Sequence, residues 1–284
     1  VQRPTLVAAL RQQYAHLPAA PAVVANIAAL ADEATFTVTT GQQLGLLGGP
    51  LYTLHKTITV LRLAAALRAR YPAQRFVPVF WLAGEDHDAE EVRRAYFSYT
   101  GFAEYPGAFA SATGRHAVDG PLRGVPPAWQ EKAGALYGPG ANWGLAFRRL
   151  WHELFGGLGL VLLDGDDPSL KARFAPLAAQ ELRDMPTAPA VERQTAALEA
   201  AGYRGQIHAR PVNLFQLTDT HRARLVQVPG GWEAEGTGRV NSAQGWAQHF
   251  ASAPTEASPN VALRPLYQET ILPNLAYVGG WAEV

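Results

Sequence analysis

Two stretches decide how this chain folds: TGQQLGLLGGPLYTLHK at residues 40–56 and FWLAGEDHD at residues 80–88. In each, an apolar or β-branched run gives way to glycine and polar residues at the point where a strand should end. Ligands of an open α/β sheet bind at the carboxyl ends of its strands. Both stretches therefore predict strand ends that carry the polar groups of an enzyme.

The residues around these stretches have the pattern of a βαβ unit. β-branched residues at 35–40 predict a strand, the spacing of apolar residues over 51–70 predicts a helix, and the apolar run at 76–83 predicts a buried parallel strand. Because crossovers of this kind join parallel strands, we expect an α/β fold with a parallel sheet. Strands at 159–163 and 275–278 would extend it.

The rest of the chain supplies further expected elements. A helix is expected at 90–96, and Ser169 is a candidate N-cap for a helix that reaches about Met185. Residues 213–217 and 224–228 look like a β pair. We expect five segments: a first half of the core at 1–96, an irregular insertion rich in glycine and proline at 97–140, a core continuation at 141–190, a second insertion at 191–258, and a return to the core at 259–284.

Composition excludes several classes of protein. Of the 284 residues, 48% are hydrophobic, which suits a globular chain, and 24 basic residues balance 24 acidic ones. A net charge of zero gives no field that would draw nucleic acid or a membrane surface. The chain has no cysteine, so thiolate metal sites and a cysteine nucleophile are excluded. No signal peptide or membrane span is visible, and we expect a cytoplasmic protein.

The first candidate site is the glycine-rich loop at 41–50 with the helix after it. Glycine lets backbone approach a ligand, and the amino end of a helix suits phosphate or carboxylate. Lys56 would add a full charge beside His55, and Gln42 and Gln43 offer amide groups. The pattern is neither GxGxxG nor GxxxxGK[ST], so no nucleotide motif is present. The alternative is a turn that merely packs a helix on a strand.

The second candidate site is the run Glu85, Asp86, His87 and Asp88. Four ionisable residues after a buried strand are costly unless they are paired or functional. A carboxylate beside His87 could orient the imidazole as a general base, and the same residue types are also metal ligands. The alternative is a solvated turn in which an aspartate caps the next helix.

Two weaker candidates follow later in the chain. Arg264 and Gln268 would share one face of a helix, where the arginine could grip a carboxylate or a phosphate. An ordinary surface salt bridge is the equal alternative. The three aspartates that follow the strand at 159–163 fit a helix cap better than a ligand site; they are Asp164, Asp166 and Asp167.

Four motifs together resemble one known family. They are TGQQLGLLGGPLYTLHK, VPVFWLAGEDHD, QIHARPVNLFQLTD and SPNVALRPLYQETILPNLAYVGG, in that order. This series is similar to the bacillithiol biosynthesis cysteine-adding enzymes. The resemblance covers residues 38–280 and implies a Rossmann-like core related to class I aminoacyl-tRNA synthetases, with two connecting-peptide insertions.

The resemblance also implies a reaction and a set of site residues. Family members add cysteine to glucosaminyl-malate, and the synthetase analogy suggests that ATP activates the cysteine carboxylate. For the chemistry of amide formation, His87, flanked by Asp86 and Asp88, is the candidate base, and Lys56 is a candidate for stabilising phosphate or oxyanion charge. The remaining residues expected to bind substrate are Gln42, Gln43, Gly45, Gly49, Pro50, Tyr52, His55, Glu85, Arg264 and Gln268.

Other interpretations of the sequence stay open at this stage. One is a metal-dependent hydrolase or nucleotidyltransferase that uses Asp86, His87 and Asp88 as ligands, and another is a ligand-binding module without turnover. The family pattern G-P-x-E is replaced here by Gly-Gly-Trp-Ala-Glu at 279–283. We expect a fragment that lacks the family's coiled-coil part, through which the protein would form a homodimer. No nucleic acid or membrane partner is expected.

Overall fold

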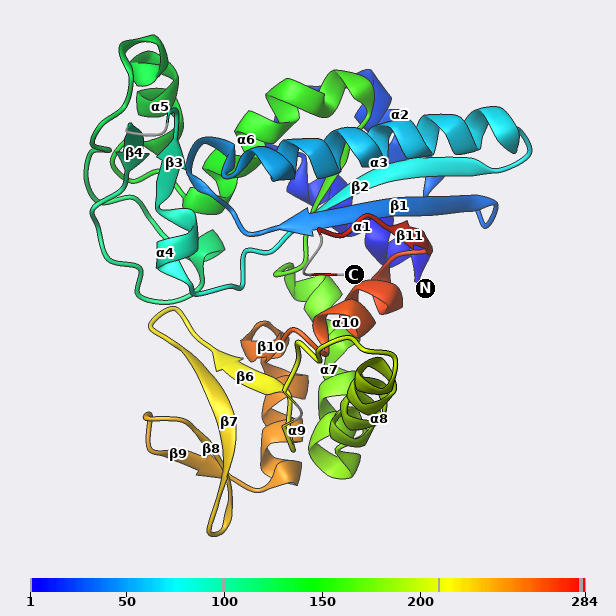
Figure 1. Cartoon of the computed structure of the whole chain (residues 1–284), viewed down its shortest axis with the longest axis vertical. Helices are drawn as coiled ribbons and strands as arrows, with labels where there is room; N and C mark the ends of the chain where they lie inside the picture. Colours follow the sequence, from blue (N-terminus) through cyan, green and yellow to red (C-terminus); the bar gives the residue numbers. More distant parts are fainter. Residues whose placement is uncertain (1, 99–100, 209, 281–282, 284) are drawn as a thin grey trace. The chain divides into compact units, whose positions relative to one another are not determined.

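The computed structural model describes residues 2–98, 101–208, 210–280 and 283. The chain forms two compact units, one made of Gln2–Gly165 with Leu272–Val284 and the other of Asp166–Ile271. In the first unit, four parallel strands lie in the order β11 (Asn274–Tyr277), β1 (Thr35–Gln42), β2 (Arg75–Leu82) and β5 (Val161–Asp164). Figure 1 labels β11, β1 and β2 of this sheet. The expected α/β fold with a parallel sheet is confirmed.

The register of the sheet aligns the two stretches that the sequence singled out. Gly41 lies opposite Trp81 and Gln42 lies opposite Leu82, so β1 and β2 end at the same level. Since parallel strands point their carboxyl ends to one edge, the loops that follow must start side by side. The segment after β11 begins near the same level, because the Val278 N–H donates to Thr39 O over 2.7 Å.

Helices α3 (Leu51–Arg70) and α6 (Trp143–Phe155) pack on one face of this sheet (Figure 1). Phe80 of β2 contacts Phe147 and Trp151 of α6, with ring centroids 5.8 and 6.1 Å apart. The helix expected at 51–70 is confirmed residue for residue. The first unit also contains α1 (Arg3–Gln13), α2 (Pro21–Ala29), and the 3-10 turns η1 (Leu46–Gly48), η2 (Thr113–Arg115), η3 (Pro127–Trp129) and η4 (Gly156–Leu158).

Two expectations for the segment after β2 are wrong. Only α4 (Ala89–Val92) of the helix expected at 90–96 is helical, because β3 (Arg94–Tyr96) pairs with β4 (Phe102–Glu104). The Arg94–Glu104 ion pair, 2.8 Å, holds this hairpin, which crosses the boundary expected at 96/97. The insertion expected to be irregular contains α5 (Gln130–Tyr137), whose Leu136 and Tyr137 are buried.

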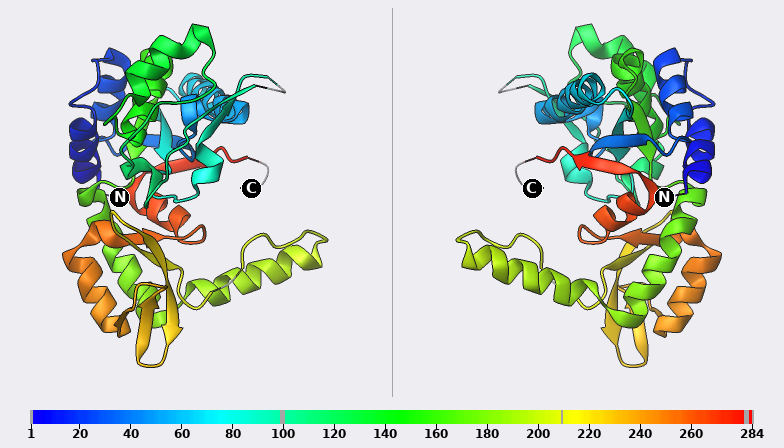
Figure 2. Two further views of the ribbon diagram at one scale, coloured as in Figure 1. Left: turned by 90° about the vertical axis from the view of Figure 1, so that its left-hand side faces the viewer. Right: turned by 90° about the vertical axis from the view of Figure 1, so that its right-hand side faces the viewer.

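The second unit is an antiparallel sheet covered by helices. Its strands lie in the order β10 (Ala257–Pro259), β6 (Leu214–Leu217), β7 (Arg222–Val228), β8 (Gly231–Ala234) and β9 (Arg239–Asn241). The predicted pairing of β6 with β7 is confirmed. The helices are α7 (Pro168–Asp184), α8 (Thr187–Ala200), α9 (Ala243–Ser252) and α10 (Arg264–Ile271), with the 3-10 turn η5 (Pro254–Glu256). Figure 2 shows α8 projecting away from its own unit.

The start of α7 corrects the expected cap. Asp167 is the N-cap: its carboxylate accepts from Ser169 N–H over 2.9 Å and from Leu170 N–H over 3.3 Å. Ser169, the expected cap, is already inside the helix because Pro168 occupies the first helical position. The units divide after Gly165 and Ile271, whereas the expected segment limit at 190/191 falls within α8. In the described part of the chain, no helix has the length and apolar character needed to cross a bilayer.

Candidate functional site

The candidate site is centred on Lys56, at the carboxyl edge of the parallel sheet. Lys56 lies in the second turn of α3, and its side chain is only 6% exposed. Its Nζ donates to Gly41 O over 2.7 Å, at the end of β1. Helix α3 thus places the ammonium group of Lys56 next to the end of β1, where the glycine-rich loop begins.

Two further acceptors complete the environment of Lys56. Its Nζ donates to Gln42 Oε1 over 2.9 Å and to the carboxylate of Glu283, whose oxygens lie 3.1 and 2.9 Å away. An ammonium has three N–H donors, and these three groups occupy all of them. Because charge-assisted hydrogen bonds are the strong ones, this arrangement fixes the position of the cation.

The loop after β1 is folded tightly enough to require glycine. A Cβ on Gly45 would lie 2.4 Å from Gly49 Cα, and Gly49 has φ of 73°, a conformation that L side chains rarely adopt. Pro50 is the N-cap residue of α3, and no side chain caps this end of the helix. Among the described residues, no acceptor takes the backbone N–H groups of Leu51 and Tyr52. This end of α3 therefore presents free donors and a positive dipole end.

The loop after β2 is held from its other side by η2. Gly114 N–H donates to Gly84 O over 2.8 Å, and Thr113 N–H donates to Asp86 O over 2.7 Å. The carboxylate of Asp86 also accepts from the backbone N–H of His87 over 2.7 Å. Asp88 caps α4 by accepting from Glu90 N–H. The predicted acidic run is therefore an ordered turn with a helix cap.

Gln43 connects the two loops. Its Nε2 donates to Asp86 Oδ2 over 3.3 Å and to Glu91 Oε2 over 2.6 Å. Its Oε1 accepts from Gln42 Nε2 over 2.5 Å. These contacts place the loop after β1 beside the loop after β2.

The pKa values of two residues in the site are shifted by burial and by neighbouring charges. Partial burial raises the pKa of Glu91, and the neighbouring carboxylates of Asp88 and Asp86 raise it further. Partial burial likewise raises the pKa of Tyr52, whose ring lies 5.3 Å from Lys56 Nζ. Asp86, Asp88 and Glu91 thus lie on the side of β2, whereas Lys56 and its partner Glu283 lie on the side of β1.

The imidazole of His87 is half exposed beside this cluster. Its Nδ1 lies 3.7 Å from Asp86 Oδ1, which is longer than a hydrogen bond. The described residues contain no group of three or more histidine, aspartate or glutamate side chains arranged to hold a metal ion. The suggested ligand set of Asp86, His87 and Asp88 therefore has no geometric support.

The remaining predicted residues occupy different places. Pro50, Tyr52 and His55 lie on the exposed side of the start of α3, and Glu85 is half-buried. Arg264 and Gln268 belong to the other unit, where Arg264 Nη1 donates to Gln268 Oε1 over 3.1 Å along α10. Their expected role in substrate binding stays a prediction. Asp167 serves as the helix cap described above.

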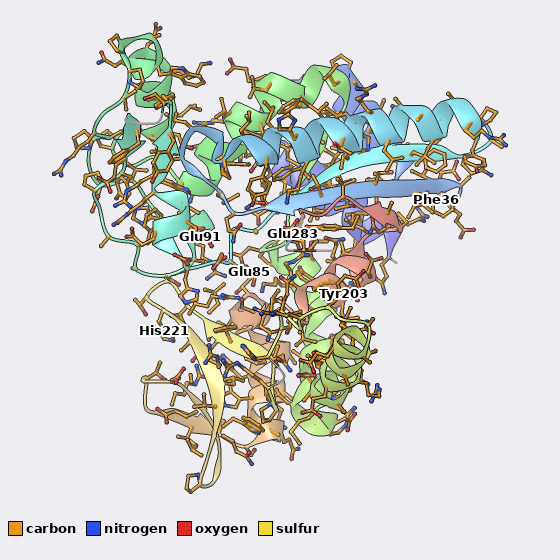
Figure 3. The ribbon with its side chains drawn as sticks, in the orientation of Figure 1. Phe36, Glu85, Glu91, Tyr203, His221 and Glu283 are labelled. Atoms are coloured by element: carbon orange, nitrogen blue, oxygen red, sulfur yellow. The ribbon has the colours of Figure 1, made fainter. Side chains whose placement is uncertain are left out.

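Two residues of the site were missed by the sequence reasoning. Glu283 contacts Lys56 from a segment 227 residues away, and Glu91 is reached by Gln43 across 48 residues. Figure 3 labels Glu85, Glu91 and Glu283. An acidic residue soon after each strand end is the available signal, but Glu91 falls within the helix expected at 90–96.

Comparison with known proteins agrees with this architecture. The sequence model described as "Bacillithiol biosynthesis BshC, N-terminal Rossmann-like domain" matches residues 1–118 and 127–284. A protein of Cytophaga hutchinsonii named "Putative cysteine ligase BshC" is 38% identical over 289 residues, covering 100% of this chain and 55% of that protein. Proteins of the same name from Flavobacterium johnsoniae and Bacillus mycoides are 36% and 29% identical, each covering 99% of the chain.

The matched share of each relative shows how much of the relatives' length this chain covers. The alignments span 55%, 55% and 56% of these three relatives. The chain therefore spans about half the length of the curated relatives it matches. With its parallel sheet and its match over nearly every residue, the chain belongs to the bacillithiol biosynthesis BshC family and corresponds to that family's N-terminal Rossmann-like domain.

Proposed function

We propose that this chain supplies the Rossmann-like part of a cysteine ligase that joins cysteine to glucosaminyl-malate in bacillithiol biosynthesis. The names of the relatives support a cysteine ligase. The observation that carries the proposal is the nearly buried ammonium group of Lys56, held at the strand edge where α/β sheets bind ligands.

The chemistry of amide formation explains why such a site is needed. Joining a carboxylate to an amine is uphill in water, so the carboxylate of cysteine must first be activated. Negative charge then develops on oxygen as the amine attacks, and a fixed cation stabilises it at no cost of reorganisation. We assign this role to Lys56. Since all three of its donors are occupied, an anionic group that reaches Lys56 replaces Glu283, whose side chain is 36% exposed.

A base is needed because only the neutral amine is a nucleophile. His87 is the candidate, because its imidazole is accessible and lies next to the loop that Gln43 joins to the Lys56 side. The carboxylate of Asp86 accepts a hydrogen bond from the backbone N–H of His87, and Asp88 caps the helix that follows. The substrate-binding roles of Arg264 and Gln268 are part of the same proposal.

ATP is the proposed source of activation. The free N–H groups of Leu51 and Tyr52, the glycine-rich turn before them and the charge of Lys56 are donors of the kind that hold phosphate. When bound there, ATP would supply the group that turns the cysteine carboxylate oxygen into a leaving group.

Reconstitution with purified full-length protein tests the proposal. The protein is incubated with cysteine and glucosaminyl-malate, with and without ATP, and the condensed product is measured by mass spectrometry. We expect ATP-dependent product from the wild type and at least a hundredfold slower formation with Lys56→Met, in the range that removal of one oxyanion-stabilising group produces. Tight binding of either substrate without turnover would support a binding module instead.

Two other expectations belong to this proposal. A homodimer formed through a coiled coil would place that interface in the half of the family's length that this chain does not span. Sedimentation of the full-length protein measures the oligomeric state. The cytoplasmic location is tested by fractionation of cells that express it.

A further inference from the structure

A continuous chain of hydrogen bonds crosses the strand ends of the site. It begins at Lys56, whose Nζ donates to Gln42 Oε1 over 2.9 Å. Gln42 Nε2 then donates to Gln43 Oε1 over 2.5 Å, and Gln43 Nε2 donates to Glu91 Oε2 over 2.6 Å. Three links thus connect a nearly buried cation on α3 with a carboxylate on α4.

The chemical character of its two ends gives this chain one direction. A lysine ammonium can only donate hydrogen bonds, and a carboxylate can only accept them. Gln42 must therefore turn its oxygen toward Lys56 and its nitrogen toward Gln43. Gln43 must turn its nitrogen toward Glu91. Both amide orientations are determined by the ends, and neither side chain can flip without breaking two links.

We propose that Glu91 and Gln43 are positioning residues, which hold the amide of Gln42 in the orientation that fixes Lys56. In the sequence interpretation Gln42 and Gln43 were substrate-binding residues and Glu91 had no role. In this structure both side-chain amides make their hydrogen bonds within the protein. The expected effect on kcat rests on the proposed ligase function, whereas the expected effect on the reactivity of Lys56 does not.

Glu91 is the stronger of the two anchors for Gln43. Its oxygen lies 2.6 Å from Gln43 Nε2, whereas that of Asp86 lies 3.3 Å away. Asp86 also accepts from the backbone N–H groups of His87 and Asp88, so it serves mainly its own turn.

The reactivity of Lys56 toward a small acylating reagent tests this series of hydrogen bonds without any assay of enzyme activity. The polypeptide has three lysines, which mass spectrometry of peptides distinguishes: Lys56, Lys132 and Lys171. Lys132 is 40% exposed on the surface beside Glu153, and Lys171 is fully buried. Acetic anhydride acylates only the neutral amine, so the rate at Lys56 reports how firmly its acceptors hold the ammonium form. The two other lysines serve as internal references in the full-length protein.

Three variants give the chemical test its controls. Glu91→Leu removes the anchor, and we expect acylation of Lys56 to become about fivefold faster, as loss of one ordinary hydrogen bond predicts. Glu91→Gln keeps an acceptor oxygen for Gln43 and should restore most of the wild-type rate. Glu90→Leu removes the same charge from the same helix, but Glu90 pairs with Arg93 and Arg94, so it should leave Lys56 unchanged.

A double-mutant cycle tests whether Glu91 acts through the amides. Gln42→Leu removes the acceptor of Lys56 directly, so adding Glu91→Leu to it should change the acylation rate no further. In the ligase assay, Glu91→Leu should lower kcat by about fivefold and leave KM within about twofold, because it alters a group that acts in the transition state. Glu91→Gln should recover kcat.

The outcomes separate this inference from the proposed function. Equal acylation of Lys56 in wild type and Glu91→Leu, or additive effects in the cycle, would overturn the positioning role even if the wild type makes product. If the wild type makes no product while the cycle shows coupling, the ligase proposal fails and the positioning role stands.

Discussion

Lys56 Nζ lies 2.9 Å from Glu283 Oε2, although 227 residues separate them in the chain. Glu283 also accepts from the backbone N–H of Gly280 over 2.5 Å. The carboxylate therefore connects the segment after β11 with the start of α3, and Gly41 O adds the end of β1. This pair places a charged group from each of two distant segments at one edge of the sheet.

Replacement of Lys56 is the first prediction. Lys56→Met should lower product formation at least a hundredfold and lower the free energy of unfolding by about 1–3 kcal/mol, because Gly41 O and Gln42 lose a donor in a nearly buried place. Product assays and chemical denaturation measure the two effects. Lys132→Met breaks an exposed ion pair and should change stability by less than about 0.5 kcal/mol. A Lys56→Met protein that works at the normal rate would contradict the assignment.

The parallel sheet could be predicted because its pattern is local. The β-branched run at 35–40, the helix at 51–70 and the apolar run at 76–83 each carry their own periodicity. The segment after β2 could not be predicted in the same way. Arg94–Tyr96 has no local feature that separates a short strand from a helix, and its pairing with Phe102–Glu104 decides the outcome.

Some contacts of the candidate site could likewise be predicted from the sequence, and others could not. Contact between Gln43 and Asp86 could be predicted, because parallel strands bring their carboxyl ends to one edge. The partners Glu91 and Glu283 could not, because nothing near either residue in the sequence indicates Gln43 or Lys56. Long-range polar contacts depend on loop paths, and those are fixed by packing rather than by local pattern.

The close approach of Gly45 to Gly49 gives a second prediction. A Cβ at Gly45 would lie 2.4 Å from backbone Gly49 Cα, so Gly45→Ala must displace the loop that precedes α3. We expect a loss of about 1–3 kcal/mol in stability, the usual cost of overpacking, together with weaker substrate binding. Thermal denaturation and KM measure these effects. Gly134→Ala is the control: beyond the adjoining residues and backbone of its own helix, nothing lies within 4 Å of the added carbon, and alanine favours helix α5.

The proposed base gives a third prediction. His87→Ala should lower kcat by about 10²–10⁴-fold, the range of general acid–base catalysis, with little loss of stability because the side chain is half exposed. Steady-state kinetics and the melting temperature measure the two quantities. His16→Ala removes an exposed histidine of no assigned role and should behave as wild type. Unchanged kcat in His87→Ala would contradict the assignment of His87 as the base.

Tyr14 gives a fourth prediction, on the stability of the sheet below the site. Its hydroxyl accepts from the N–H of Leu162 in β5 over 2.7 Å, and burial raises its pKa to about 12. Tyr14→Phe should cost about 1–3 kcal/mol at pH 7, because the Leu162 N–H then lacks its acceptor. Chemical denaturation measures this loss, and Tyr71→Phe, which alters an exposed ring, should cost far less.

The same tyrosine makes stability depend on alkaline pH with a definite sign. Its pKa in the folded protein lies above the value near 10 of an unfolded chain, so the folded state binds the proton more tightly. The contribution of the neutral hydroxyl is complete below pH 10 and is lost as the pH rises from about 10 to about 12. The difference in unfolding free energy between wild type and Tyr14→Phe should therefore shrink across that range. A difference that grows with pH would show that the hydroxyl ionises more readily in the folded protein than in the unfolded chain.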